Sequence, residues 1–313
     1  MPRNPTPPLA SRSHRTAIVT DAQDVDPRWL LRTLAVLIGA AMICAYITLC
    51  FLFYQGQWQF VLHPTAQAAV PAPSSAFPYH DIEFDYTETG QPQLHGWWIP
   101  ATTPKTRYAK VTVLYLHRGD GSLAEAQPDL QQLHDFGLNV FCFDYRGFGR
   151  SAGPHPTERR MREDTEAAWL YLAQAHKMPA THVILYGEGV GAALAIQLSS
   201  EHPRIPAIMF EDPDFEVTNH VLHDPRVKLL PARLLFHERF DLDNSFSTLT
   251  VPKLIFLNDP ADDVTTAHIA ATAAPKFIVH LDGLDDAQAT AARKQSLSRF
   301  LDEYLPDPAL LPK

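Results

Sequence analysis

The stretch VILYGEGVGAALAIQL, residues 183–198, predicts a strand, a sharp turn of small residues and a helix. The apolar, partly β-branched run before Gly187 is typical of a buried strand, and the Ala- and Leu-rich run after Gly191 is typical of a helix. Glycines between the two runs allow the chain to reverse tightly. A strand that feeds directly into a helix is the building unit of an α/β sheet.

The same alternation continues on both sides of this stretch. Strand-like runs are KVTVLYLH (110–117), NVFCFDY (139–145), PAIMFED (206–212), VPKLIFLND (251–259) and KFIVHLDG (276–283). Two further strands are expected around a turn within residues 81–101. Repeated β-α-β units predict an α/β fold with a mostly parallel central sheet and helices on both faces. Residues 213–250 interrupt the pattern and predict a short cap insertion over the C-terminal edge of the sheet, where ligands of such sheets bind.

The composition argues against a nucleic-acid partner, a disulfide framework and a metal site. The 313 residues carry a formal net charge of −9 and show no basic stripe, so we expect no nucleic-acid partner. Cys44, Cys50 and Cys142 form no Cys-x-x-Cys pair, which argues against a disulfide framework or a zinc site. The spacing His220-x-x-His223 lacks a third and fourth ligand, so we expect no metal and no cofactor.

Residues 33–54, TLAVLIGAAMICAYITLCFLFY, form a run of 22 residues without a charge. This length and composition predict a single-pass transmembrane anchor over about 29–55 rather than a buried core helix. The positive charges lie before the run, and none follows until Lys105. By the positive-inside rule, the N-terminus is expected in the cytoplasm and the C-terminal domain in the periplasm or another extracytoplasmic space.

The organisation expected from these features has five parts. A cytoplasmic tail covers residues 1–28, and a Pro-rich linker covers 56–79 after the anchor. The large domain covers 80–305, and a short tail covers 306–313.

Four local motifs resemble the α/β-hydrolase superfamily, and in particular its membrane-anchored, serine-aminopeptidase-like branch. FDYRGFGRSAG (143–153) is the most specific match, followed by acidic positions at Glu158 and Asp164. LYLHRGDG (114–121) is similar to the family's oxyanion loop, LYGEGVGAALA to its nucleophile elbow and FLNDPADDV to the segment of its catalytic acid. The resemblance implies an α/β-hydrolase fold over residues 80–305 and a triad in the order Ser, Asp or Glu, His.

The nucleophile position of that triad is Gly189, which has no side chain to attack a substrate. Glu188 is a candidate substitute, but it lies one residue away from the exposed centre of the turn. We therefore expect Glu188 to pack beside the elbow and bind backbone or an arginine. Ser122, Ser151, Ser199 and Ser200 are expected to form local hydrogen bonds rather than to act as nucleophiles.

The acid and base positions carry three aspartates. Asp262 stands where the family has its triad acid, and Asp285 or Asp286 stands where it has the histidine base. His268 and His280 are nearby in the sequence, but on elements where a packed or surface role is expected.

The oxyanion loop also departs from the family, because Arg118 replaces the usual glycine. The backbone N–H groups of Gly119 and Val190 remain candidate donors to an oxyanion. The Arg118 side chain is expected to fill the site or to pair with Glu188, Asp262 or Asp286.

These positions together predict a membrane-anchored hydrolase-like protein without an ordinary triad, which binds a small-molecule or lipid-like ligand, or another partner, in its cleft. Two alternatives stay open. One is an active hydrolase of ester, amide or lipid-like substrates that uses a displaced set of residues. The other is a structural protein of the cell envelope.

Overall fold

Strand β4 (Thr112–Leu116) lies within the central sheet, and all five of its side chains are buried. Parallel partners flank it on both sides, β6 (Asn139–Phe143) and β7 (Val183–Glu188). Helices cover both faces, which is why the sequence of β4 shows no polar alternation. These observations come from a computed structural model that describes residues 26–65, 73–85, 93–101, 108–258 and 260–305.

The sheet has eight strands in the order β10-β9-β8-β7-β4-β6-β3-β2. The strands not yet given are β2 (His80–Phe84), β3 (Leu94–Ile99), β8 (Ile208–Glu211), β9 (Lys253–Leu257) and β10 (Lys276–His280). Only the pairings of β2 with β3 and of β3 with β6 are antiparallel. The mostly parallel sheet that the sequence predicts is thereby confirmed. The turn between β2 and β3 lies partly outside the described residues.

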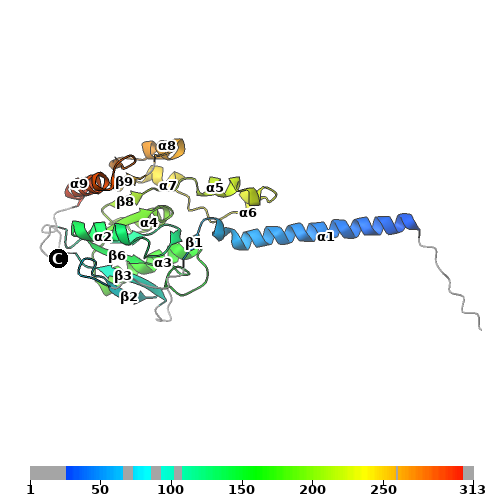
Figure 1. Cartoon of the computed structure of the whole chain (residues 1–313), viewed down its shortest axis with the longest axis horizontal. Coiled ribbons are helices and arrows are strands. Elements are labelled where there is room, and N and C mark those ends of the chain that lie inside the picture. The colour runs from blue at the N-terminus through cyan, green and yellow to red at the C-terminus, as the bar shows by residue number, and fades with distance from the viewer. Residues whose placement is uncertain (1–25, 66–72, 86–92, 102–107, 259, 306–313) are drawn as a thin grey trace, which may run out of the picture. The chain divides into compact units, whose positions relative to one another are not determined.

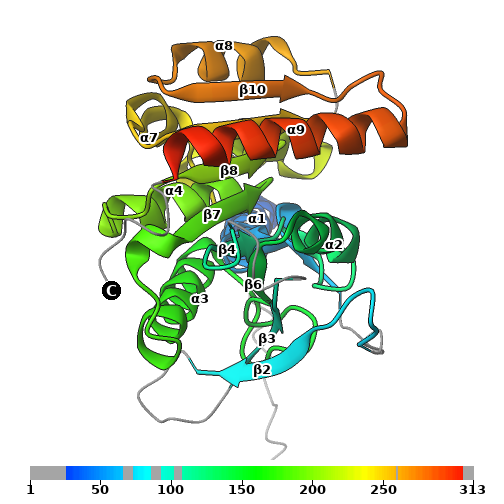
Figure 2. The ribbon, with the colours of Figure 1, turned by 90° about the vertical axis from the view of Figure 1, so that its left-hand side faces the viewer.

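Helices pack on both faces of this sheet (Figure 2). The helices of the domain are α2 (Gln127–Phe136), α3 (Glu158–Leu170), α4 (Gly191–Glu201), α5 (Val217–His223), α6 (Ala232–Leu235), α7 (Asp243–Thr248), α8 (Asp263–Ala271) and α9 (Asp286–Tyr304). One core cluster contains buried side chains of α2 and α9, and the other contains those of α3, α4 and the cap. The sheet therefore separates two hydrophobic cores, as expected for a three-layer α/β fold.

The motif 143–153 is held together by buried charges. Asp144 accepts hydrogen bonds from the backbone of Leu123 (2.9 Å) and Arg150 (3.3 Å). The Arg146 side chain donates from Nε to Asp164 Oδ1 at 2.8 Å, and its backbone N–H donates to Asp164 Oδ2 at 2.9 Å. Burial raises the pKa of Asp164 to about 6, although its bonds to Arg146 oppose this shift. The motif 143–153 is thus fixed to α3 through the bonds between Arg146 and Asp164.

The chain divides into two compact units, residues 1–49 and 50–313. Helix α1 (Pro27–Gly56) begins in the first unit and ends in the second (Figure 1). The candidate membrane span Pro27–Phe60 has a mean hydropathy of 2.5 in its most apolar window, of which 6% is buried. These properties fit a membrane helix or a signal sequence. The terminal tails 1–25 and 306–313 lie outside the described residues.

The segment expected as a linker, residues 56–79, is partly folded onto the domain. After the 3₁₀ helix η1 (Gln57–Phe60), strand β1 (His63–Pro64) pairs in parallel with β5 (Asp120–Gly121). Leu62, Phe77 and Tyr79 are buried. The segment contains four prolines, but its apolar residues have a hydrophobic core to join.

The cap insertion contains α5, the 3₁₀ helix η4 (Pro225–Val227), α6 and α7. Glu158, at the start of α3, accepts hydrogen bonds from the backbone N–H groups of Arg239 (2.9 Å) and Phe240 (3.0 Å). The acidic position that follows the motif in the sequence therefore ties the cap to the domain.

The Arg146–Asp164 pair predicts a large stability difference between two arginines. Arg146→Met leaves a fully buried carboxylate without its partner, so we expect the free energy of unfolding to fall by about 3–5 kcal/mol. Arg159→Met is the matched control, because Arg159 pairs with Glu163 on the surface of α3 and such pairs contribute less than about 1 kcal/mol. Denaturant unfolding of both variants, followed by circular dichroism, checks this. Equal losses in the two would contradict it.

Candidate active site

The turn between β7 and α4 has the geometry of an elbow and lacks a nucleophile. Gly189 stands at its centre with φ of +54°, a left-handed conformation that favours glycine. A Cβ atom built on Gly189 would lie 3.4 Å from Cβ of Arg118, its nearest neighbour. A small side chain would therefore fit there, so what the position lacks is the reacting group rather than space.

The Glu188 side chain is buried and both of its oxygens are engaged. Oε1 forms an ion pair with the Arg118 guanidinium, and Oε2 accepts a hydrogen bond from the hydroxyl of Tyr115 at 2.8 Å. Of the three acids considered for Arg118, the structure pairs it with Glu188, with Asp120 as a second carboxylate at 3.9 Å. Burial lowers the pKa of Arg118, but the hydrogen bond and charge of Glu188 outweigh burial and raise it. Glu188 thus acts as the counter-ion of Arg118.

The oxyanion loop is packed against the segment that follows α1. The N–H of His63 donates to the carbonyl of Gly119 at 2.7 Å. A Cβ on Gly119 would come within 2.9 Å of Leu62 and 3.2 Å of Val190, so only glycine fits this contact. Within the described residues, the N–H groups of Gly119 and Val190 donate no hydrogen bond. Both candidate oxyanion donors are therefore still available at the elbow.

The acid and base positions serve as helix caps. Asp262 is exposed and accepts a hydrogen bond from the N–H of Thr265 at 2.6 Å, which lowers its pKa and begins α8. Asp285 forms a capping box with Gln288 at the start of α9, and exposed Asp286 is the first residue of that helix. Each carboxylate thus has a structural role in its helix start that requires no histidine.

The histidines and serines near the site have local partners. His268 stacks on Phe215 with ring centroids 4.8 Å apart, and His280 lies 3.7 Å from Asp282. The hydroxyls of Ser122, Ser199 and Ser200 bond to Glu125, Ile196 and Gln197, and that of Ser151 bonds to Asp144 and accepts the backbone N–H of His95 at 2.9 Å. None of these four serines is therefore bonded to a histidine ring in the manner of a triad.

A second buried charge network, which no motif of the sequence indicates, lies on the α2 and α9 side of the sheet. Glu211, at the end of β8, binds Arg293 of α9 and also accepts hydrogen bonds from Tyr186 and from Asn258. Burial disfavours the charged form of Glu211, but its bonds to Arg293 outweigh this and lower its pKa. Residues from non-adjacent elements meet here, so no local spacing marks the network in the sequence.

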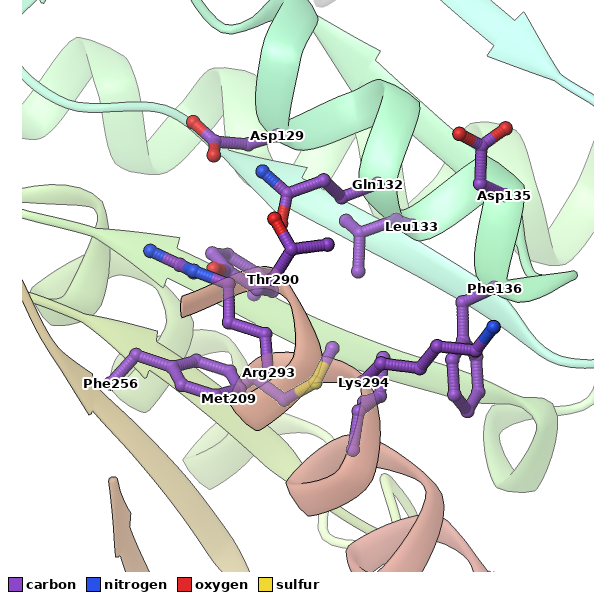
Figure 3. Close-up of a pocket in the computed structure, with 12 residues that line it drawn as sticks. Asp129, Gln132, Leu133, Asp135, Phe136, Met209, Phe256, Thr290, Arg293 and Lys294 are labelled. Atoms are coloured by element: carbon purple, nitrogen blue, oxygen red, sulfur yellow. The ribbon is translucent and has the colours of Figure 1, made fainter. Parts of the chain in front are cut away.

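A pocket of about 170 Å³ opens beside this network, between α2 and α9 (Figure 3). Its apolar lining comes from Leu133, Phe136, Met209, Phe256 and Leu297. Its polar lining includes Asp129, Tyr186, Thr290, Arg293 and Lys294. Burial, with the nearby charges of Glu211 and Glu188, raises the pKa of Asp129 to about 7. A carboxyl group in this state exchanges a proton near neutral pH and can donate or accept a hydrogen bond.

Neither histidine spacing nor acidic clustering defines a metal centre. His220 and His223 are exposed on α5, and Nδ1 of His223 bonds the carbonyl of Asn219 at 2.8 Å. Glu166, Glu201 and His202 offer ligand atoms within 4.8 Å of one another. His202 already bonds Glu166 at 2.9 Å, and we assign no metal to either group.

Three known proteins and one family model show what the chain is similar to. The model of the family described as serine aminopeptidase, S33, matches residues 107–262. A Mycobacterium tuberculosis protein described as "Uncharacterized protein Rv2307c" is 29% identical over 284 residues, which cover 87% of this chain and 96% of that protein. The Escherichia coli K12 protein described as "Uncharacterized protein YfhR" is 24% identical over 261 residues, which cover 79% of this chain and 88% of that protein.

Among solved structures, the Pyrococcus furiosus esterase Pf2001 is similar with a TM-score of 0.58 and 20% identity, over 79% of this chain and 98% of that one. At this identity the likeness concerns the fold. Together with the strand order, the elbow and the family match, it shows that the chain belongs to the α/β-hydrolase superfamily.

Proposed function

We propose that this protein is a membrane-anchored member of the α/β-hydrolase superfamily that binds a ligand and does not use the ordinary serine-hydrolase mechanism. The observation that carries the proposal is Gly189 at the centre of an otherwise intact elbow. The capping roles of Asp262 and Asp285 support it, and Asp286, the other candidate for the base position, is the exposed first residue of α9 and has no imidazole to act as the base.

The anchor part of the proposal is supported by α1. Its candidate span is long enough to cross a hydrocarbon core of about 30 Å, at 1.5 Å per residue. Arg28 and Arg32 lie on the N-terminal side of the apolar run, and no positive charge follows until Lys105. This asymmetry favours a cytoplasmic N-terminus and an extracytoplasmic domain.

The pocket between α2 and α9 supports the ligand part. Its apolar walls and few polar groups are typical of sites for small organic molecules. We infer that it takes a small, mostly apolar molecule with one hydrogen-bonding group directed at Asp129. Thr290 and Lys294 also line the pocket, and both residues are exposed to solvent.

The missing nucleophile predicts an ordered series of ester-hydrolysis rates. The full-length protein in detergent is expected to give no turnover of short or long p-nitrophenyl esters above the detergent blank. Gly189→Ser alone is also expected to give none, because a serine without a base loses up to about a millionfold in rate. Gly189→Ser combined with Asp286→His should give a trace, since Asp285 keeps the helix cap.

Robust turnover by Gly189→Ser alone would contradict the account of the missing base. Turnover by the unmodified protein that disappears in Glu188→Gln would favour the alternative of a hydrolase with a displaced nucleophile. Gly283→Ser, at another left-handed glycine with open space around it, is the matched control for the substitution itself.

The raised pKa of Asp129 predicts a pH dependence of stability. The folded state holds this proton up to about pH 7, whereas an unfolded chain releases it near pH 4, so stability should fall as the pH rises between these values. Asp129→Asn removes the fall and should stabilise the protein by about 4 kcal/mol at pH 8, because each of the roughly three pKa units corresponds to about 1.4 kcal/mol. Denaturant midpoints from pH 4 to pH 8 measure this, with Asp135→Asn of the same helix as the control for lost charge. Parallel profiles for Asp129→Asn and the unmodified protein would refute it.

A further inference from the structure

Two leucines of the cap are far more exposed than the other large apolar side chains of the described domain beyond α1. Leu229 and Leu234 are 85% and 83% exposed, whereas Leu170, Ile278 and Leu284 are exposed by 40–42%. The two leucines lie close together in the sequence, on either side of the start of α6. Scattered single apolar residues are normal on a surface, but two leucines that are each more than 80% exposed in one short segment indicate a binding surface.

The same segment is basic. Lys228 and Arg233 are exposed beside the leucines, and neither forms an ion pair within the described residues. The only acidic residue between positions 225 and 240 is Glu238, and it is buried. In a chain with a net charge of −9, this is a local reversal of sign. We call Lys228, Leu229, Arg233 and Leu234 the cap patch.

The cap patch is tied to the end of α1 by a buried glutamine. Gln57 is 1% exposed, and its Nε2 donates to the carbonyl of Leu235 at 3.2 Å. Its Oε1 accepts from the N–H of His237 at 2.6 Å. Tyr54 packs against the His237 ring at 4.8 Å, and the Arg226 guanidinium lies 4.4 Å from the centre of the Phe60 ring. The segment that carries the patch is thus fixed to residues 54–60, where the apolar run ends.

We propose that the cap patch docks on the surface of the membrane that α1 crosses, with Leu229 and Leu234 in the headgroup–acyl boundary and Lys228 and Arg233 on anionic headgroups. Leucines flanked by basic residues are the composition of segments that lie in a membrane interface. The inference rests on the proposed anchor, because the end of α1 brings the patch to the bilayer. The bilayer is favoured over a protein partner because the segment that carries the patch is hydrogen-bonded, through Leu235 and His237, to Gln57 within the candidate span Pro27–Phe60.

Spin-label accessibility in the full-length protein tests this docking. Leu229→Cys and Leu234→Cys are made separately with Cys44 and Cys50 replaced by serine, labelled with a nitroxide and reconstituted in vesicles that contain phosphatidylglycerol. Labels at both positions are expected to collide severalfold more often with oxygen than with a water-soluble nickel complex. Leu284→Cys, a leucine outside the cap, is the matched control and should favour the nickel complex.

The charges provide a second arm. Lys228→Glu with Arg233→Glu should move both labels toward the aqueous reagent, whereas Arg204→Glu with Lys110→Glu, an equal charge change elsewhere on the exposed surface, should not. Labels that behave like the Leu284 control would overturn the docking. Labels shielded from both reagents would point to a protein partner and would also overturn it.

Alkaline extraction of the same vesicles distinguishes a failure of the docking proposal from a failure of the anchor proposal. A protein that resists extraction but carries water-exposed cap labels retains its anchor and lacks the docking. A protein that is extracted has no spanning anchor, and the docking proposal then fails with the proposed function.

Discussion

The ion pair between Arg118 and the buried Glu188 is the interaction around which the site is organised. Glu188 ends β7, directly before the tight turn, and its carboxylate is held by Arg118 and Tyr115. Burying a carboxylate costs several kcal/mol unless a partner compensates it. Glu188 therefore needs the Arg118 side chain to stay beside the elbow. Arg118, which replaces the usual glycine of the oxyanion loop, is thus required as the counter-ion of Glu188, the residue before Gly189.

This pair is one part of a larger polar layer on the same face of the sheet. Tyr115 and Tyr186 stack with ring centroids 4.9 Å apart, and Tyr186 leads on to Glu211 and Arg293. A serine hydrolase hydrogen-bonds its nucleophile to a base that a third group orients, whereas here the buried carboxylates Glu188 and Glu211 are paired with arginines. Among the described residues, the N–H groups of Gly119 and Val190 have no hydrogen-bond acceptor, and the Asp129 carboxyl lines the pocket. These groups are suited to holding a ligand.

The sequence alone predicted the features that depend on residues close together in the chain. Unbroken apolar runs marked the buried strands, and the absence of a side chain at Gly189 needed no structure. It left open which of three acids binds Arg118, because Glu188, Asp262 and Asp286 follow different strands that end at one edge of the sheet. It also missed Arg293 and Asp129, which meet through packing between distant helices. Leu62 was expected in a linker, but it joins a core that only the folded domain creates.

If the ordinary serine-hydrolase mechanism is lost, no serine or other hydroxyl group is activated as a nucleophile beside the elbow. Intact-mass measurement of the full-length protein after saturation with a fluorophosphonate tests this, because the reagent traps an activated hydroxyl nucleophile whatever the natural substrate. We expect an unchanged mass for the folded protein. An adduct that maps to the cleft, and that is lost on unfolding before the reaction, would contradict it.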